Sequence, residues 1–255
     1  MRLMARTRHA TPEDFARIYA RFEAPIARFD CGKKCAPLNG GEPVCCSTEN
    51  AVPIVSRPEW RLLESRTDLW HRFKPFDAET RKIVDDLHSS CAAIECKGAR
   101  HCERENRSLA CRAFPFFPYI TAAGEFVGLT TFWYFEDRCW VISNLKIVDR
   151  RFLQECCAAF DDLFACDRDE FEAVSEESAS MRRVFSRWTR PIPILTREGR
   201  CLKALPHGAR IVKARPTEFG PHGPYRSKGA YERAVREAEA ERLRRTSRPP
   251  SRPGA

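Results

Sequence analysis

The chain has 255 residues, of which 43% are hydrophobic and 31% are charged, and its formal net charge is +9. This balance is typical of a globular protein and excludes a wholly disordered chain. No run approaches the roughly 18 consecutive apolar residues of a membrane span. The charged start of the chain, residues 1–9, lacks the apolar region of a secretory signal. We therefore expect a cytoplasmic protein with no membrane partner.

Three helices are predicted in the first 90 residues. Thr11, Pro12 and the two acids after them are typical of a helix N-terminus, and apolar residues at helical spacing extend this helix to about Ala24. A capping-box pattern at 56–59 begins the second helix, and residues 76–90 form the third. The cysteine-rich stretches 30–51 and 91–112 lack a regular period, so we expect them to be loops.

The second half of the chain mixes strands and helices. Gly124 separates two runs of aromatic and β-branched residues, which predicts a β-hairpin. Residues 150–178 are expected to be helical, 181–220 contain short apolar runs among prolines, and 229–245 form a charged helix. The predicted fold class is therefore α+β: a mainly helical small domain with a β-hairpin and two cysteine-rich loops that converge on a metal site.

Charge divides the chain unevenly. Residues 1–180 hold 25 Lys/Arg and 29 Asp/Glu, whereas 181–255 hold 19 and 6. We therefore expect a cysteine-rich metal-binding domain over 1–180 and a basic C-terminal extension over 181–245. The Pro-, Ser- and Arg-rich residues 246–255 are expected to be a disordered tail.

Cysteine is the most informative residue type, with 13 in the chain. An odd number cannot pair completely, and thiols stay reduced in the cytosol, so disulfides do not explain the count. Two groups stand out in the sequence: Cys31, Cys35, Cys45 and Cys46, followed by Cys91, Cys96, Cys102 and Cys111. Clustered thiolates are ligands for Zn²⁺ and for iron–sulfur clusters. The irregular spacing, without two C-x2-C hooks, favours an iron–sulfur cluster over zinc.

The second group is part of a recognisable motif. The segment from Cys102 to Phe116, with Arg107 four residues before Cys111, resembles the C…RPxxCRxFPF motif of the bacterial CxxCxxCC family of putative zinc- or iron-chelating domains. Ser108 stands at the usual proline, and the first motif is here C-x3-C-x9-CC. The resemblance covers about residues 28–145, and Cys139 takes roughly the place of a further family cysteine.

The resemblance implies metal binding but no substrate. Flagellin lysine methylases look like relatives, and this relation implies a second reading: an enzyme that uses the cluster for redox chemistry or for protein lysine methylation. No catalytic residue is assigned, because the chain has no serine elbow, P-loop or dinucleotide-binding glycine motif. An unidentified protein partner or substrate fits either reading.

The predicted metal ligands come from both loops and from beyond the hairpin. They are Cys31, Cys35, Cys45, Cys46, Cys102, Cys111 and Cys139, with Cys91 and Cys96 as less favoured choices. We expect one of the adjacent pair Cys45-Cys46 to bind metal while the other packs. Arg107 and Arg112 are expected to hold the second loop by bonding backbone carbonyls or a carboxylate, a role that we favour over contact with a substrate. The remaining cysteines are interpreted as packing residues: Cys156, Cys157, Cys166 and Cys201.

The basic C-terminal part permits two interpretations. A nucleic-acid-binding arm would place arginines against phosphates, and the candidates are Arg182, Arg183, Arg187 and Arg190. We favour a solvated extension, because few aromatic residues interleave with these arginines. On that view, a chain that lacks residues 221–255 folds and keeps its metal.

Overall fold

The computed structural model describes residues 9–246 of the chain. The expected α+β class is confirmed, with helices outweighing two small antiparallel sheets. The helices are α1 (Pro12–Arg21), α2 (Gly32–Cys35), α3 (Arg57–Arg66), α4 (Ala78–Asp85), α5 (Leu109–Ala113), α6 (Arg150–Cys166), α7 (Arg168–Arg187) and α8 (Lys228–Thr246). The strands are β1 (Ile54–Ser56), β2 (Trp70–Arg72), β3 (Cys91–Cys96), β4 (Phe116–Ile120), β5 (Phe126–Thr131), β6 (Ile192–Leu195), β7 (Cys201–Ala204) and β8 (Ile211–Lys213).

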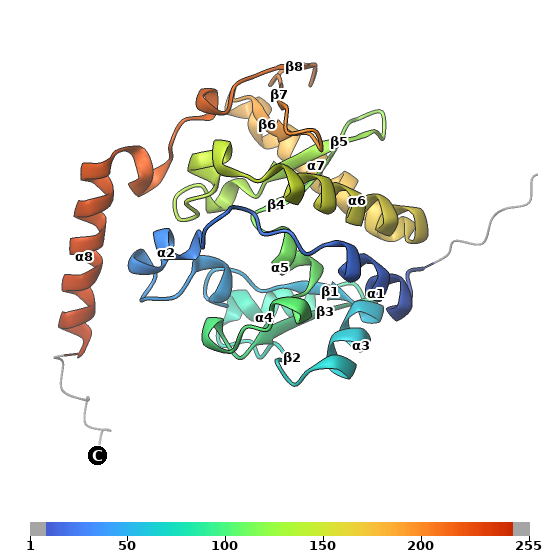
Figure 1. Ribbon diagram of the computed structural model, residues 1–255, viewed down its shortest axis with the longest axis horizontal. Coiled ribbons are helices and arrows are strands. Elements are labelled where there is room, and N and C mark those ends of the chain that lie inside the picture. Colours follow the sequence, from blue (N-terminus) through green and yellow to red (C-terminus); the bar gives the residue numbers. More distant parts are fainter. Residues whose placement is uncertain (1–8, 247–255) are drawn as a thin grey trace, which may run out of the picture.

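The two sheets belong to two layers of the molecule. The lower layer in Figure 1 contains a three-stranded sheet of order β1-β3-β2, with α3 and α4 beside it. The upper layer contains a five-stranded sheet of order β4-β5-β6-β7-β8, with α6 and α7. The predicted hairpin is confirmed as β4 and β5, in which Phe116 pairs with Thr131.

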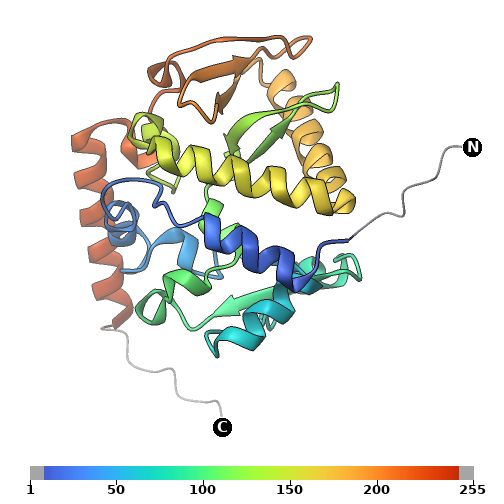
Figure 2. The same cartoon turned by 45° about the vertical axis from the view of Figure 1, so that its right-hand side comes forward.

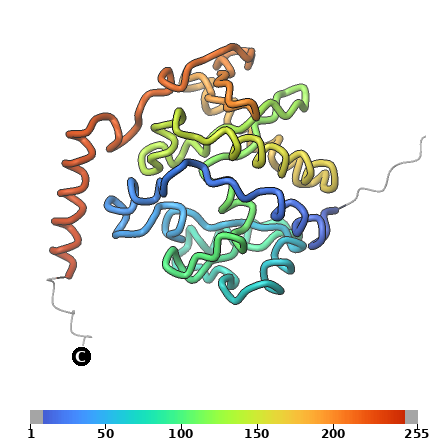
Figure 3. The backbone as a smooth tube through the Cα atoms, viewed as in Figure 1, coloured from blue at the N-terminus to red at the C-terminus, as the bar shows by residue number. Residues whose placement is uncertain are grey.

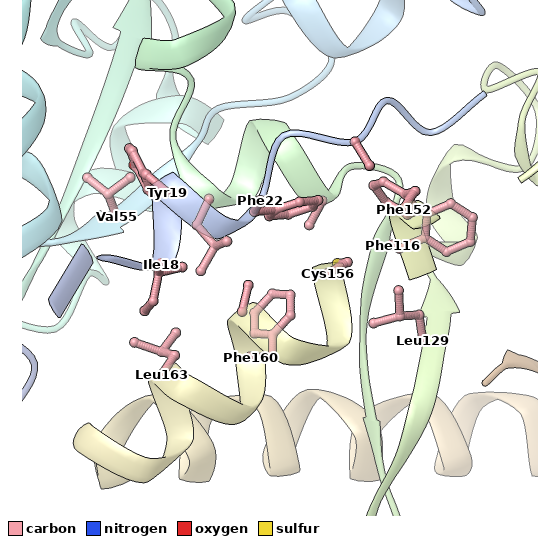
Figure 4. Packing of buried hydrophobic residues seen from close by; sticks show 14 of the residues in the cluster. Ile18, Tyr19, Phe22, Val55, Phe116, Leu129, Phe152, Cys156, Phe160 and Leu163 are labelled. Carbon is pink, nitrogen blue, oxygen red and sulfur yellow. The ribbon is translucent and has the colours of Figure 1, made fainter. Parts of the chain in front are cut away.

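Helix α1 and the segment after it lie between the layers. In Figure 3 the blue chain leaves α1 and crosses the middle of the molecule to reach α2. The apolar positions that predicted α1 are buried: Phe15, Ile18, Tyr19 and Phe22. Figure 4 shows residues of α1 facing residues of α6, with Phe22 and Phe152 rings 5.6 Å apart. This aromatic and aliphatic core joins the two layers.

One sequence prediction fails at a buried strand. Residues 91–112 were expected to be a loop, yet β3 occupies their start and α5 their end. The central residues of β3, Ala92-Ala93-Ile94, are buried, and β3 pairs with β1 through its first half and with β2 through its second half. A short run with two alanines carries neither a period-two pattern nor strong β propensity. Burial within a central strand therefore overrides the local signal.

The expected domain boundary at 180/181 is also corrected. It falls inside α7, and β6–β8 beyond it extend the sheet that the hairpin begins. Leu129 of β5 pairs with Leu195 of β6, and both side chains are buried. The chain up to Lys213 therefore belongs to the body of the protein. The expected helix over 150–178 is two helices, because Asp167 caps α7.

The C-terminal helix is the most separate element. The charged helix predicted over 229–245 is confirmed as α8, which stands beside α2 in Figure 2 and has no buried residue. Of the expected disordered tail, 246–255, only Thr246 is described, and the rest lies outside the described residues. No helix among the described residues is both long enough and apolar enough to cross a membrane.

A buried carboxylate connects the three helices α1, α3 and α5. Glu59 of α3 accepts hydrogen bonds from the Tyr19 hydroxyl of α1 (2.5 Å) and from the backbone N–H of Leu109 in α5 (2.6 Å). Burial raises the pKa of Glu59, although both donors favour its charged form. The acid thus holds α5 against α1 and α3.

We predict that Glu59→Ala lowers the free energy of unfolding by about 3 kcal/mol, because it leaves the buried Leu109 N–H without a partner and opens a cavity. Glu59→Gln retains an acceptor oxygen for both donors and should cost much less. Urea denaturation of the two variants measures the difference. Equal losses would show that the hydrogen bonds to Glu59 contribute little.

A second acid at the same end of the molecule makes stability depend on pH. Burial, with the charges of Glu59, Asp167 and Asp169, raises the pKa of Glu170 from 4.5 to about 7. The folded protein thus holds this proton more tightly than the unfolded chain. Its stabilising contribution is complete below about pH 4.5 and is lost as pH rises through about 7.

We therefore expect Glu170→Gln to reduce the fall in unfolding free energy between pH 5 and pH 8. Denaturant titrations at several pH values measure this slope. Glu176→Gln changes an exposed acid of the same helix and should leave the slope unchanged. If both variants match the wild type, Glu170 does not take up a proton on folding.

Candidate metal centre

Eight of the 13 cysteines form one network in the described structure. Each is paired with at least one other member in the sense that ionisation of one thiol changes the pKa of the other, and together they come from five separate segments of the chain. The members are Cys31, Cys35, Cys45, Cys46, Cys96, Cys102, Cys111 and Cys139. All seven of the favoured sequence candidates are therefore brought together, and Cys96 joins them.

Strand β3 distinguishes the two less favoured candidates. Cys91 and Cys96 are its first and last residues, so about 16 Å of extended chain separates them. Cys96 interacts with Cys46 and Cys102, whereas Cys91 lies near Asp167 and Glu170 at the other end of the strand. The structure thus brings Cys96 to the network and keeps Cys91 away from it.

Part of the network surrounds a small cavity of about 70 Å³. Its walls are mainly apolar, with Leu69 and Trp70 among them, and Arg107 is the charged residue in the lining. Five cysteines also line it: Cys45, Cys46, Cys96, Cys102 and Cys111. An apolar pocket that encloses several sulfur atoms suits a soft metal or a sulfide-containing cluster.

Arg107 and Arg112 have different partners. The Nε of Arg107 donates to the Sγ of Cys102 at 3.0 Å, so this arginine contacts a candidate ligand directly. Arg112 instead donates to the carbonyl oxygens of Phe22, Glu105 and Arg107, which fastens the loop to the end of α1. The expected structural role is observed for Arg112, whereas Arg107 faces the sulfur atoms.

Local backbone structure positions Cys111 at the centre. Ser108 is fully buried and caps α5, and its hydroxyl accepts from the N–H of Cys111 at 3.2 Å. Because Glu59 holds the N–H of Leu109, the first turn of α5 is fixed at both positions. The helix therefore carries Cys111 to a defined place.

The thiols differ in acidity because their surroundings differ. Burial raises the pKa values of Cys111 and Cys139 to about 12, so both thiols keep their protons at neutral pH without a cation. The hydrogen bond with Cys45 lowers the pKa of Cys46 to about 7. A metal ion that binds here has to displace protons, which makes its binding depend on pH.

The sulfur atoms are spaced more widely than in a closed zinc site. A tetrahedron with Zn–S bonds of about 2.3 Å holds its sulfurs about 3.8 Å apart. The Sγ atoms of Cys45 and Cys46 are 4.0 Å apart, but within residues 9–246 no three cysteine sulfurs lie within 4.8 Å of one another. Binding of a single zinc ion would thus require the cysteine loops to move closer together.

The remaining cysteines lie elsewhere. Cys156 is a buried residue of α6 and belongs to the hydrophobic core shown in Figure 4. Cys157 and Cys166 are also buried on α6, and Cys201 is half-buried at the start of β7. All 13 thiols are free.

A different group of possible metal ligands was not found by sequence reasoning. His9, Asp167 and Asp169 place one ligand atom each within 4.8 Å of the others. Both carboxylate oxygens of Asp167 are already engaged, however: one accepts from the N–H of Ala10, and the other accepts from the first turn of α7. This group therefore works as a helix cap.

The segment before α8 also contacts the centre, which sequence reasoning missed. Tyr225 is buried, interacts with Cys35 and Cys139, and donates to the carbonyl oxygen of Arg138 at 2.9 Å. Gly223 has a φ of +52°, and a Cβ there would lie 2.6 Å from the carbonyl oxygen of Asp137. The expectation that residues 221–255 are dispensable is therefore not supported.

The arginines proposed for a nucleic-acid arm are partly engaged within the body. Arg182 donates to the carbonyl oxygen of Ile120 and lies over the ring of Tyr119. Arg190 forms two hydrogen bonds with the carboxylate of Glu136, at 2.8 and 3.0 Å. These two arginines therefore make contacts within the body of the protein, near the five-stranded sheet.

A larger cleft gives access to the network from outside. It has a volume of about 780 Å³ and lies between the first cysteine loop and α8. Cys46 and Cys96 are in its lining, and α8 contributes Glu241, Arg242 and Arg245. The network is thus reachable from one side of the molecule.

Comparisons with protein-family models, curated proteins and solved structures find no match to this chain. The resemblance to the CxxCxxCC family therefore depends on the motif residues alone.

We predict that a chain ending at residue 220 is less stable than one ending at 227, by roughly 3 kcal/mol, because only the longer chain keeps the buried Tyr225. Urea denaturation of the two truncated proteins measures this difference. The chain ending at 227 should lose less stability relative to the full-length protein, since α8 has no buried residue and its Tyr231 is only partly buried beside Tyr225. Equal stabilities for all three chains would show that Tyr225 contributes nothing to packing.

Proposed function

We propose that the chain is a cysteine-ligated metal protein, with either an iron–sulfur cluster or zinc at the eight-cysteine network. One observation supports this most strongly: cysteines from five separate segments meet, while all of them remain free thiols. Packing alone does not require thiols from so many segments at one place. Thiolate ligation of a metal gives such a gathering of cysteines a function.

Two further features support a cluster over a single zinc ion. The sulfurs are spread over a wider region than one tetrahedral ion occupies. Arg107 also donates to Cys102, and hydrogen bonds to sulfur are among the factors that set the potential of an iron–sulfur centre. A brown protein with iron and labile sulfide after anaerobic purification would support the cluster, and a colourless protein with zinc would support a structural site.

The ligand assignment predicts a specific pattern of metal loss. Cys102→Ser and Cys111→Ser should each lose metal and become more sensitive to protease, because a metal fixes both cysteine loops at once. Cys201→Ser changes a half-buried thiol outside the network and should keep its metal. Metal analysis of anaerobically prepared protein measures the result. The assignment is wrong if all three variants behave alike, and the proposed function fails if no preparation contains metal.

A second candidate function is a cluster-dependent redox enzyme or protein lysine methylase. The observation that favours it is the cleft of about 780 Å³, because a purely structural metal needs no access from outside. Bleaching of a visible spectrum by dithionite would support a redox role, since zinc does not change oxidation state. A nucleic-acid role has less support, because Arg182 and Arg190 are engaged in the body.

A further inference from the structure

A hollow on the surface of the lower layer gathers three arginines. It has a volume of about 340 Å³, and its lining comes from α3 and β2, which both lie in the lower part of Figure 1. The lining residues are Arg57, Trp60, Arg61, Glu64 and Arg72. None of them lines the small cavity or the large cleft at the cysteine network, so the hollow is a separate feature of the molecule.

The three guanidinium groups have no acidic partner within the described protein. Arg57, Arg61 and Arg72 are exposed, and among residues 9–246 none of them forms an ion pair or a side-chain hydrogen bond. Glu64 is the one acid in the lining and follows Arg61 by a single turn of α3, yet it forms no ion pair with it. The positive charge of the hollow is therefore largely uncompensated.

Helix, strand and an aromatic ring together position these groups. Arg57 and Arg61 are four residues apart on α3, so they lie one turn apart on the same face of the helix. Like charges at this spacing repel, and helix stability therefore does not explain the pair. The guanidinium of Arg72 lies over the ring of the buried Trp60, 4.8 Å from its centre, and this contact holds Arg72 in place.

The surplus of positive charge is local to the hollow. Residues 1–180 hold 25 Lys/Arg and 29 Asp/Glu, so the part of the chain that contains α3 and β2 is acidic on balance. The lining of the hollow instead holds three arginines and one glutamate, which is a net charge of +2. A basic chain as such does not account for this group, whereas an anionic ligand would neutralise it.

The number of donors and the charge select the class of anion. Each guanidinium carries five N–H donors in a planar fork, and a single fork can match the two oxygens of one carboxylate. A phosphoryl group has three terminal oxygens and a charge of about −1.5 to −2 at pH 7, which suits three arginines and a net charge of +2. We propose that the hollow binds the phosphoryl group of a small phosphorylated molecule, held by Arg57, Arg61 and Arg72.

The size and the floor of the hollow favour a small ligand over a nucleic-acid strand. A volume of about 340 Å³ lies near the lower end of the range for small-molecule sites. Proteins that bind single strands offer aromatic faces on which bases stack. Trp60, the aromatic residue in this lining, is buried and has Arg72 over its ring, so it offers no such platform.

The test measures binding of simple anions to the full-length protein by isothermal titration calorimetry at low salt. We expect saturable binding of glycerol phosphate, and weaker binding of succinate, a dicarboxylate of similar charge. Arg57→Ala and Arg61→Ala should each weaken binding of glycerol phosphate by at least about tenfold, because each removes a charge-assisted pair of hydrogen bonds. Arg61→Lys keeps the charge without the fork and should recover only part of the loss.

The matched control is Arg81→Ala, which removes an exposed arginine of α4 outside the hollow and should bind like the wild type. The inference is overturned if the wild type shows no saturable binding, or if Arg57→Ala and Arg61→Ala bind as tightly as the control. Equal affinity for succinate would show a general anion site and overturn the phosphoryl assignment. Binding of a short RNA or of phosphoinositide vesicles, without binding of glycerol phosphate, would overturn the assignment to a small molecule.

Discussion

The buried carboxylate of Glu59 is the contact on which the arrangement of the cysteine-bearing segments depends. It accepts from Tyr19 of α1 and from the backbone of α5, and thereby fixes the start of the helix that carries Cys111. A buried acid is costly unless its oxygens are hydrogen-bonded. The two donors offset this cost, and Arg112 adds a positive charge 4.4 Å from the centre of the Tyr19 ring. One acid thus connects the aromatic core to the cysteine network.

The cysteine network differs from Glu59, because burying its thiols costs little and the contacts between them are weak. Burial raises the pKa of six of its thiols, and these neutral thiols pack without great cost but hold the loops together only weakly. The segments that carry them have little regular structure beyond α2, α5 and the end of β3. Most of the organisation of this region comes from Glu59, Ser108 and Arg112, which are hydrogen-bonded around the sulfurs and not to them. A proposed metal would add the strong links that the thiols lack.

Sequence reasoning predicted the elements whose signals are local. Thr11 and the apolar positions of α1, the hairpin around Gly124 and the charged helix α8 all appear as expected. It also identified seven cysteines that the structure brings together. It missed β3, because two alanines and an isoleucine become a strand only through burial between β1 and β2. It could not choose between Cys91 and Cys96 for the same reason: the choice depends on which end of that strand faces the network. Tyr225 was missed because nothing local marks a residue whose partner is Arg138.

The position of Tyr225 in the chain has a consequence for biosynthesis. All eight cysteines of the network leave the ribosome before Tyr225 does, and Tyr225 belongs to the same buried cluster as Cys35 and Cys139. During synthesis the packing around these two thiols is therefore completed only after the last cysteine of the network has been made, when the segment around Tyr225 docks. An ion or cluster supplied from the side of Tyr225 would have to arrive before docking is complete, or the docked segment would have to detach again to admit it.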